Sequence, residues 1–212
     1  MDEIPNIRLR DNHIEGTISL PVWCNFLSRQ GAPGSYETQE NVKGIFKISV
    51  GGDMVMDQPA ITVDHINAYK YITNHSEQIQ ESILTRLLAE YQNLQTEYGY
   101  DEEDAKEMMP NVDSIEHFKN LIGLSQVHLM NVSKNEFAYV GYEFSCTWDD
   151  EHGLGFMTHK DKIIDFGGAD TSFLTWVAKK DLESGSTEEK TAGNLSMLKA
   201  VWKWWQKLFG SV

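Results

Sequence analysis

The sequence contains little cysteine. Only two are present, Cys24 and Cys146, and they lie far apart with no Cys-x-x-Cys pair. Disulfide-stabilised domains and thiolate zinc sites need several cysteines at short, regular spacings. The sequence therefore excludes both classes of protein. It also favours a reducing compartment, and we expect the protein in the cytoplasm.

Long apolar runs are absent too. The chain starts with MDEIPNIRLRD, which is charged and lacks the apolar segment of a secretory signal peptide. No later run approaches the roughly 18 apolar residues that a membrane-spanning helix needs. Hydrophobic residues nevertheless make up 41% of the sequence, which is ample for a buried core. We therefore expect a soluble globular protein that is not exported.

Positive charge is outnumbered by negative charge. The formal net charge is −14. Nucleic-acid binding requires clustered Lys and Arg that displace counterions, so we expect no nucleic-acid partner. An acidic surface instead complements a basic protein partner, and it also keeps a protein soluble.

Strand-like runs open the chain. Residues 13–27 mix Ile, Leu, Val, Trp and Phe with Gly and Pro, which predicts one or two strands, and a polar loop is expected in residues 28–41. Two further strand-like runs flank Gly51 and Gly52. Because glycine adopts positive φ readily, this pair suits a two-residue turn and predicts a hairpin across residues 42–59.

Helical periodicity follows. Between Asp64 and Tyr98 the apolar residues recur every three or four positions, which marks an amphipathic helix. Asn74, with a glutamate three positions later, resembles a capping box and predicts a break in that helix. Gly99 is expected to end it, and a shorter helix is expected in residues 112–122.

The third section has the pattern of a sheet. Short runs rich in β-branched and aromatic residues predict three or four consecutive antiparallel strands, in residues 124–132, 136–148, 154–159 and 162–168. A short helix is expected in residues 171–182. Strands on both sides of a helical section indicate the α+β class, with helices packed on one face of an antiparallel sheet.

The C-terminal part differs in composition. We expect a single α+β domain over residues 1–183, a polar linker over 184–193 and an amphipathic helix over 194–212. One face of that helix is apolar and rich in Trp, and the other carries three Lys. Three roles stay open: docking on its own domain or on a second copy in a homo-oligomer, contact with a membrane surface, or recognition of a partner groove.

The stretch CTWDDEHGLGFMTH joins two of the expected strands and concentrates acids and histidine. Asp149 and Asp150 can accept hydrogen bonds from backbone N–H groups of a turn. His152 can bridge two loop groups through its ring nitrogens, and Gly153 can take positive φ. We interpret this signature loop first as a turn whose shape depends on its residues, which are Trp148, Asp149, Asp150, Glu151, His152 and Gly153.

Alternation along the strand before this loop assigns its two faces. Counting back from Trp148 places a mostly apolar set on the core side: Ala138, Val140, Tyr142, Phe144 and Cys146. Cys146 is therefore expected to be a small buried residue. It is not expected to be a nucleophile, because burial opposes formation of the thiolate.

A metal site is one alternative for the signature loop. Its ligands would be His152, His159 and Asp149, which are residue types that bind zinc and similar ions. The two histidines are an odd number of residues apart and point to opposite faces of a regular strand. We therefore expect no metal and no other cofactor.

A small hydrolase is the other alternative. Glu151 and His152 would form an acid/base pair, with a second carboxylate from Asp165 or Asp170. No nucleophile elbow, phosphate loop or dinucleotide fingerprint accompanies them. An enzyme is therefore the less favoured interpretation.

Two stretches carry a resemblance to a known family. Residues 144–170, which contain the signature loop, and residues 66–91, which open with Ile-Asn-Ala-Tyr, resemble a bacterial family of unknown function that is common in Bacteroidota. Its hallmark is Trp-Asp-x-Glu-His-Gly-Leu-Gly, matched here by Trp148, Asp149, Glu151, His152, Gly153, Leu154 and Gly155. The resemblance extends to about Phe173.

This resemblance implies a function. Relatives of the family are grouped with predicted immunity proteins of polymorphic toxin systems, which neutralise a toxin by binding it. The first expectation is therefore a non-enzymatic binding protein. Its partner would be a basic protein such as a nuclease toxin, because an acidic protein attracts a basic one.

Overall fold

A seven-stranded sheet lies at the centre of the protein. The computed structural model describes residues 4–10, 13–30, 37–40, 43–53 and 60–184. All neighbouring strands of the sheet run antiparallel except β5 and β6, which are parallel. In spatial order the strands are β1 (Ile7–Arg10), β2 (His13–Ser19), β5 (Ile45–Val50), β6 (Ile122–Lys134), β7 (Phe137–Cys146), β8 (Leu154–His159) and β9 (Lys162–Gly167).

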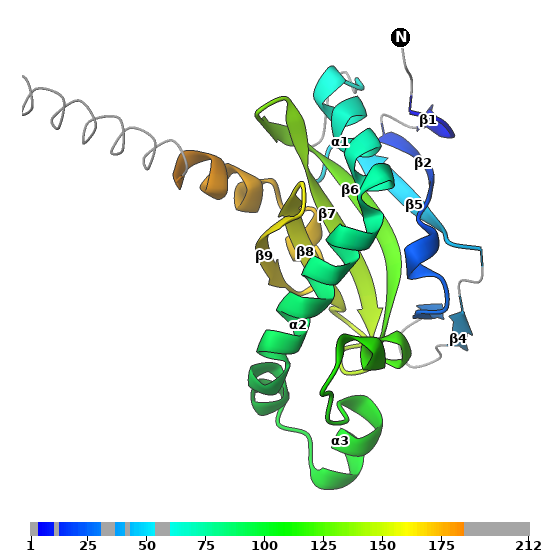
Figure 1. Ribbon diagram of the computed structural model, residues 1–212, viewed down its shortest axis with the longest axis vertical. Coiled ribbons are helices and arrows are strands. Elements are labelled where there is room, and N and C mark those ends of the chain that lie inside the picture. The colour runs from blue at the N-terminus through cyan, green and yellow to red at the C-terminus, as the bar shows by residue number, and fades with distance from the viewer. Residues whose placement is uncertain (1–3, 11–12, 31–36, 41–42, 54–59, 185–212) are drawn as a thin grey trace, which may run out of the picture. The chain divides into compact units, whose positions relative to one another are not determined.

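The two long helices lie on one face of this sheet, as expected for the α+β class. Helix α1 (Val63–Asn74) and helix α2 (Ser76–Tyr98) cross the strands at an angle (Figure 1). They belong to the long crossover that a parallel pair of strands requires, here between β5 and β6. The consecutive antiparallel strands expected after residue 122 are also confirmed, as β6 to β9.

The early strands differ from the expectation. The predicted hairpin around Gly51 and Gly52 is wrong, because both edges of β5 are already paired, one with β2 and the other with β6. The second run of that hairpin, residues 54–59, lies outside the described residues. Part of the expected loop over residues 28–41 instead forms a small separate two-stranded sheet from β3 (Leu27–Gln30) and β4 (Glu37–Glu40).

The structure confirms the helices that the apolar periodicity predicts, but it does not confirm all of their predicted ends. The break falls at His75, which ends α1 and precedes α2 without a side-chain cap, so the cap predicted at Asn74 is wrong. Gly99 ends α2 with a left-handed φ of 62°, as expected. The helix expected in residues 112–122 is a short 3-10 helix, η2 (Ile115–Asn120).

Helix α3 (Glu102–Met108) was not predicted, because it has no apolar stripe and buries none of its residues. It begins where the Asp101 carboxylate accepts the backbone N–H groups of Glu103 and Asp104, both at 3.0 Å. Three acids in its first turn add to this, since negative charge is favourable at a helix N-terminus. Capping and charge at its N-terminus therefore stabilise α3, whereas burial of apolar side chains stabilises α1 and α2.

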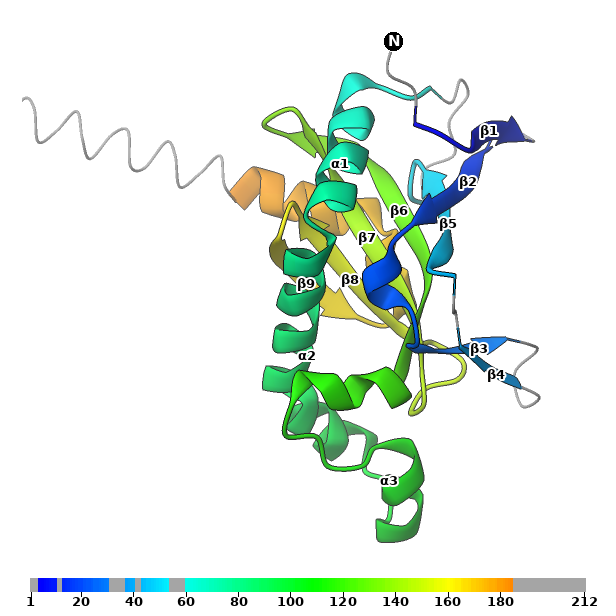
Figure 2. The same ribbon diagram turned by 45° about the vertical axis from the view of Figure 1, so that its right-hand side comes forward.

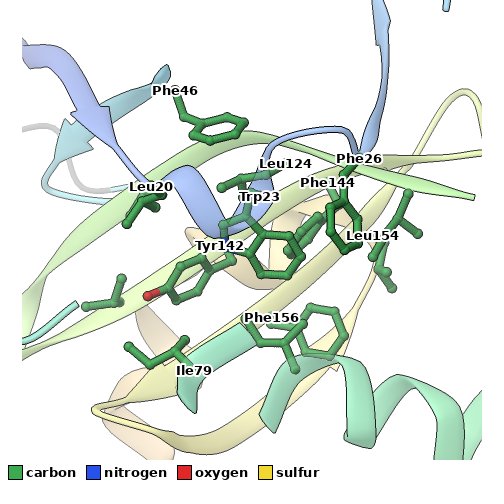
Figure 3. Close-up of a cluster of buried hydrophobic side chains, with 14 of the residues drawn as sticks. Leu20, Trp23, Phe26, Phe46, Ile79, Leu124, Tyr142, Phe144, Leu154 and Phe156 are labelled. Atoms are coloured by element: carbon green, nitrogen blue, oxygen red, sulfur yellow. The ribbon is translucent and has the colours of Figure 1, made fainter. Parts of the chain in front are cut away.

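The main core lies between the sheet and the helices. Trp23, at the end of the 3-10 helix η1 (Pro21–Trp23), packs edge-on against Phe26 and Phe144 with ring centroids 5.0 Å apart in both pairs (Figure 3). The alternation predicted along β7 is confirmed, because its whole core-side set is buried in this cluster: Ala138, Val140, Tyr142, Phe144 and Cys146. Cys146 is 2% exposed.

A second, smaller cluster covers part of the other face of the sheet. Tyr139, Met130 and Met157 are buried there beneath a segment that contains the 3-10 helix η3 (Ala169–Ser172). This segment lies so close that a Cβ added to Gly141 would be 1.6 Å from the Ser172 carbonyl oxygen. The cover does not extend over the outer strands, where Thr17 and Lys47 are exposed.

The chain after η3 is only partly described. The helix expected in residues 171–182 begins at Thr175 and is followed as far as Ser184. Residues up to Ala178 form one compact unit, and residues 179–184 are the described part of a second unit. The C-terminal helix expected over 194–212, and the linker apart from Ser184, lie outside the described residues. Among the helices that are described, none is long and apolar enough to cross a membrane.

Candidate functional site

The signature loop joins β7 to β8 and is fixed first by Trp148. Its side chain is 2% exposed and packs edge-on against Tyr91 of α2, with ring centroids 5.7 Å apart. Its carbonyl oxygen accepts a hydrogen bond from the Tyr100 hydroxyl at 2.7 Å. Just before it, the Thr147 hydroxyl donates to the Met108 carbonyl oxygen at 2.6 Å, which ties the loop to the end of α3.

Asp149 organises the turn. Its Oδ1 accepts the backbone N–H groups of His152 at 2.8 Å and Glu151 at 3.2 Å, which is the Asx-type turn that the sequence predicts. Its Oδ2 accepts the Tyr98 hydroxyl at 2.7 Å. Burial alone would raise the pKa of Asp149, but these hydrogen bonds outweigh it and the pKa is lowered. The carboxylate is therefore a charged anchor.

At two glycine positions of the signature there is no room for a side chain. Gly153 has φ of 60°, and a Cβ there would lie 2.7 Å from the Phe144 carbonyl oxygen. Gly155 faces the η3 segment, where a Cβ would lie 2.5 Å from the Gly168 carbonyl oxygen. Leu154 between them is buried in the main core. Most of the Trp-Asp-x-Glu-His-Gly-Leu-Gly pattern therefore holds the loop and its neighbouring strand in place.

His152 behaves differently from the expectation. Its side chain is 72% exposed, and its Nδ1 lies 3.2 Å from Asp149 Oδ1. The turn uses the backbone N–H of His152, and the predicted bridge through both ring nitrogens is not what orders the loop. Asp150 and Glu151 are exposed beside it. These three side chains form the part of the signature loop that faces solvent.

The structure does not bring the proposed metal ligands together. His152 precedes β8 and His159 ends it, with the His159 Nε2 2.9 Å from the Lys134 carbonyl oxygen. The His159 ring also contacts Tyr139, at 4.8 Å between centroids. Across the described ranges of the chain, no group of three His, Cys, Asp or Glu side chains could hold a metal ion.

Of the two carboxylates proposed for the acid/base set, Asp165 lies away from the signature loop and Asp170 lies near it. Asp165 pairs with Met157 of β8, which is roughly 10 Å along the strand from its start at the loop. Its carboxylate accepts the neighbouring N–H of Phe166 at 3.0 Å. Asp170 lies nearer, because the adjacent Ala169 donates its N–H to the His152 carbonyl oxygen at 2.7 Å. Asp170 itself is exposed in η3.

The loop and the end of α2 form one acidic surface. The hydroxyls of Tyr98 and Tyr100 hold the loop by hydrogen bonds to Asp149 and Trp148. The two tyrosine rings stack with centroids 6.3 Å apart. Each is 37% exposed. Figure 2 shows α3 beyond the end of α2. We call this surface the acidic end; its exposed acids and tyrosines are Glu97, Tyr98, Tyr100, Asp101, Glu102, Glu103, Asp104, Glu107, Asp150 and Glu151.

Another polar cluster was missed from the sequence. Ser49, His128 and Glu143 lie on three adjacent strands, on the face of the sheet away from α1 and α2. The Ser49 hydroxyl is 2.8 Å from His128 Nδ1, and His128 Nε2 is 3.0 Å from a Glu143 carboxylate oxygen. No sequence signal predicts this cluster, because Ser49 meets His128 only through the parallel pairing of β5 with β6.

Comparison with known proteins identifies a family. The model of a domain of unknown function, DUF6985, matches residues 15–174. The chain belongs to the DUF6985 family. The matched range of this DUF6985 protein contains the signature loop and the Ser49–His128–Glu143 cluster. Among curated proteins and solved structures, none matches the chain.

Proposed function

We propose that this DUF6985 protein is a binding protein whose acidic end takes a basic protein partner and catalyses no reaction there. The observation that carries the proposal is the pair of tyrosine hydrogen bonds. Tyr98 binds the Asp149 carboxylate and Tyr100 binds the Trp148 carbonyl oxygen, so the loop acids are held beside those of α3. A preorganised surface loses less entropy on binding than a mobile one.

The chemistry of the acidic end fits a basic partner. Its charged members are acidic apart from Lys106 on α3 and His152 at the loop. Complementary charge speeds association and disfavours wrong partners. Two partly exposed tyrosines at its centre supply apolar contact area, and tyrosine is enriched among the residues that dominate binding energy.

A toxin is the partner class that we favour. The family resemblance points to a bacterial immunity protein in the cytoplasm, and a basic nuclease toxin matches the sign of the charge. A hydrolase that uses the signature loop has less support, because Glu151 and His152 are exposed and Asp165 lies elsewhere on the sheet.

The test first identifies a gene beside this one that encodes a basic protein, and it uses that protein as the probe. Its affinity for the full chain is measured by calorimetry, and its toxicity is measured with and without co-expression. Reversing two charges of the acidic end, with Glu103→Lys and Asp150→Lys together, should weaken binding at least tenfold and abolish protection. The matched control is Glu77→Lys with Glu81→Lys, which reverses two exposed charges at the opposite end of α2.

Salt provides a second readout. The association rate of the unaltered protein should fall as ionic strength rises, because screening weakens charge attraction. Equal binding by the acidic-end variant and its control would refute the proposed surface. A neighbouring protein that binds only through other surfaces, with no salt dependence, would refute the proposed chemistry.

A further inference from the structure

The open part of the second face carries an ordered array of polar side chains. Ser49 of β5 pairs directly with His128 of β6, and Glu143 of β7 lies diagonally across from His128. Because alternate residues of a strand share a face, the three side chains project on the same side of the sheet. The Ser49 Oγ to His128 Nδ1 distance is 2.8 Å, and the His128 Nε2 to Glu143 Oε2 distance is 3.0 Å.

The surroundings hold the histidine in one orientation. His128 is only 6% exposed, and the ring of Phe173 packs against it edge-on at 5.5 Å between centroids. The carboxylate of Glu143 can only accept when ionised, so it selects the tautomer with the proton on Nε2. Nδ1 is then left as the acceptor for the Ser49 hydroxyl. This is the arrangement in which a base, oriented by a third group, activates a serine.

A groove lies beside the array. It has a volume of about 680 Å³ and is lined partly by Thr17, Lys47 and Gln126. Pockets for small ligands have volumes of roughly 300–1,000 Å³, so its size suits one. Lys47 precedes Ser49 by two residues, and Gln126 precedes His128 by two, so these residues are neighbours on the same face. The groove therefore adjoins Ser49.

The far side of the groove is basic, although the protein as a whole is acidic. Arg8 and Arg10 of β1 line it, with side chains 73% and 65% exposed. Both approach Glu15, at 4.0 and 3.6 Å. Lys47 also lines the groove, so three basic side chains and one acidic side chain face it. A ligand with a carboxylate at one end matches it.

We propose that Ser49, His128 and Glu143 form a hydrolytic site for small carboxylic esters that carry an anionic group. The Ser49 oxygen attacks the ester carbonyl carbon while its proton passes to His128 Nδ1. Collapse of the tetrahedral intermediate breaks the bond to the alcohol, which leaves with that proton. Water then attacks the acyl-serine, gives a proton to His128 and releases the acid, and the proton returns to Ser49.

The residues around Ser49 and His128 have separate roles in this reaction. Glu143 is a positioning residue, which fixes the histidine tautomer and stabilises the imidazolium formed during the attack. Lys47 and Gln126 line the groove and carry hydrogen-bond donors that can stabilise the carbonyl oxygen as it becomes negative. Arg8 and Arg10 bind the remote carboxylate. This activity is separate from partner binding at the acidic end and uses none of its residues.

Covalent labelling of the full chain provides the first test. A fluorophosphonate probe should form an adduct that peptide mass spectrometry places on Ser49, and Ser49→Ala should abolish it. Ser125→Ala is the matched control, because the Ser125 hydroxyl donates to the Glu143 carbonyl oxygen at 3.0 Å but has no histidine partner. An unlabelled Ser49 in a folded protein, or equal labelling in Ser49→Ala, would overturn the proposal.

Turnover provides the second test, with 4-nitrophenyl hemisuccinate as the anionic ester and 4-nitrophenyl butyrate as the neutral one. The anionic ester should be preferred, and Arg8→Gln should remove that preference. His128→Asn should lower kcat about 10²- to 10⁴-fold. Glu143→Gln should lower kcat with little change in KM, which a merely structural role would not produce. Hydrolysis that survives Ser49→Ala refutes the site, whereas partner binding by Ser49→Ala should be unaltered.

Discussion

Replacing Asp149 should destabilise the whole domain, because one carboxylate holds the signature loop against α2. Its side chain is 14% exposed. Besides its contact with His152 Nδ1 at 3.2 Å, it accepts three hydrogen bonds, from the N–H groups of His152 and Glu151 and from the Tyr98 hydroxyl, at 2.8, 3.2 and 2.7 Å. Asp149→Ala removes all three acceptor positions while leaving the backbone free to keep its path.

The expected magnitude follows from the exposure of the donors. The residues carrying all three donors are exposed, so water can replace the lost acceptor and the penalty for an unpaired buried group does not apply in full. A net loss of about 1 kcal/mol per bond gives about 3 kcal/mol in total. For a protein of this size, that corresponds to a fall in melting temperature of roughly 6–12 °C. Asp149→Asn keeps one oxygen and should cost about a third as much.

Calorimetry and urea unfolding measure this loss, with Glu151→Ala as the control. The Glu151 side chain is exposed in the same loop, and its replacement should change stability by less than about 0.5 kcal/mol. The dependence on pH gives a second readout. Because the folded pKa of Asp149 is lowered below 3.8, its contribution is present above that value and disappears as the pH falls through the folded pKa. Equal melting temperatures for Asp149→Ala and Glu151→Ala would refute the reasoning.

The remaining predictions concern two histidines and the C-terminal tail. His65 is 3% exposed, accepts the Thr62 N–H through Nδ1 at 3.0 Å and lies 3.1 Å from the Met130 carbonyl oxygen through Nε2. Burial lowers its pKa below 6.5, so stability should be full above that pH and fall as the pH drops, and His65→Gln should reduce this slope in acid-unfolding curves. His152→Ala should lower the melting temperature by less than about 2 °C, since its 72%-exposed ring contributes little; a fall as large as that of Asp149→Ala would contradict this. Zinc, manganese and nickel should leave the melting temperature unchanged, and a saturable rise that His152→Ala removes would restore the metal interpretation. A chain ending at Ser186 should stay folded. If residues 194–212 bind membranes, this shorter chain should lose the salt-sensitive binding to anionic vesicles that the full chain shows, and equal vesicle binding by both chains would exclude the membrane role. Unchanged light scattering would exclude a role of these residues in a homo-oligomer.

Some features of this protein follow from the sequence because they depend only on local periodicity. The faces of β7 could be assigned by alternation, since the two-residue period of a strand is a property of the backbone. The paired helices α1 and α2 could be predicted from apolar residues at every third or fourth position. The turn at Asp149 could be predicted as well, because its donors lie two and three residues further along the chain.

Other features were decided only by tertiary structure, because they join residues that are distant in sequence. The local sequence around Gly51 and Gly52 favours a hairpin. In the structure, however, β5 pairs with β6, which follows the helical crossover in the chain. That pairing alone places Ser49 beside His128, 79 residues away. The exposure of His152 likewise depends on how Tyr98 and Tyr100 of the α2 end hold the loop, and no local pattern contains that information. Periodicity determines which face of an element is buried, whereas pairing and packing determine which polar side chains meet.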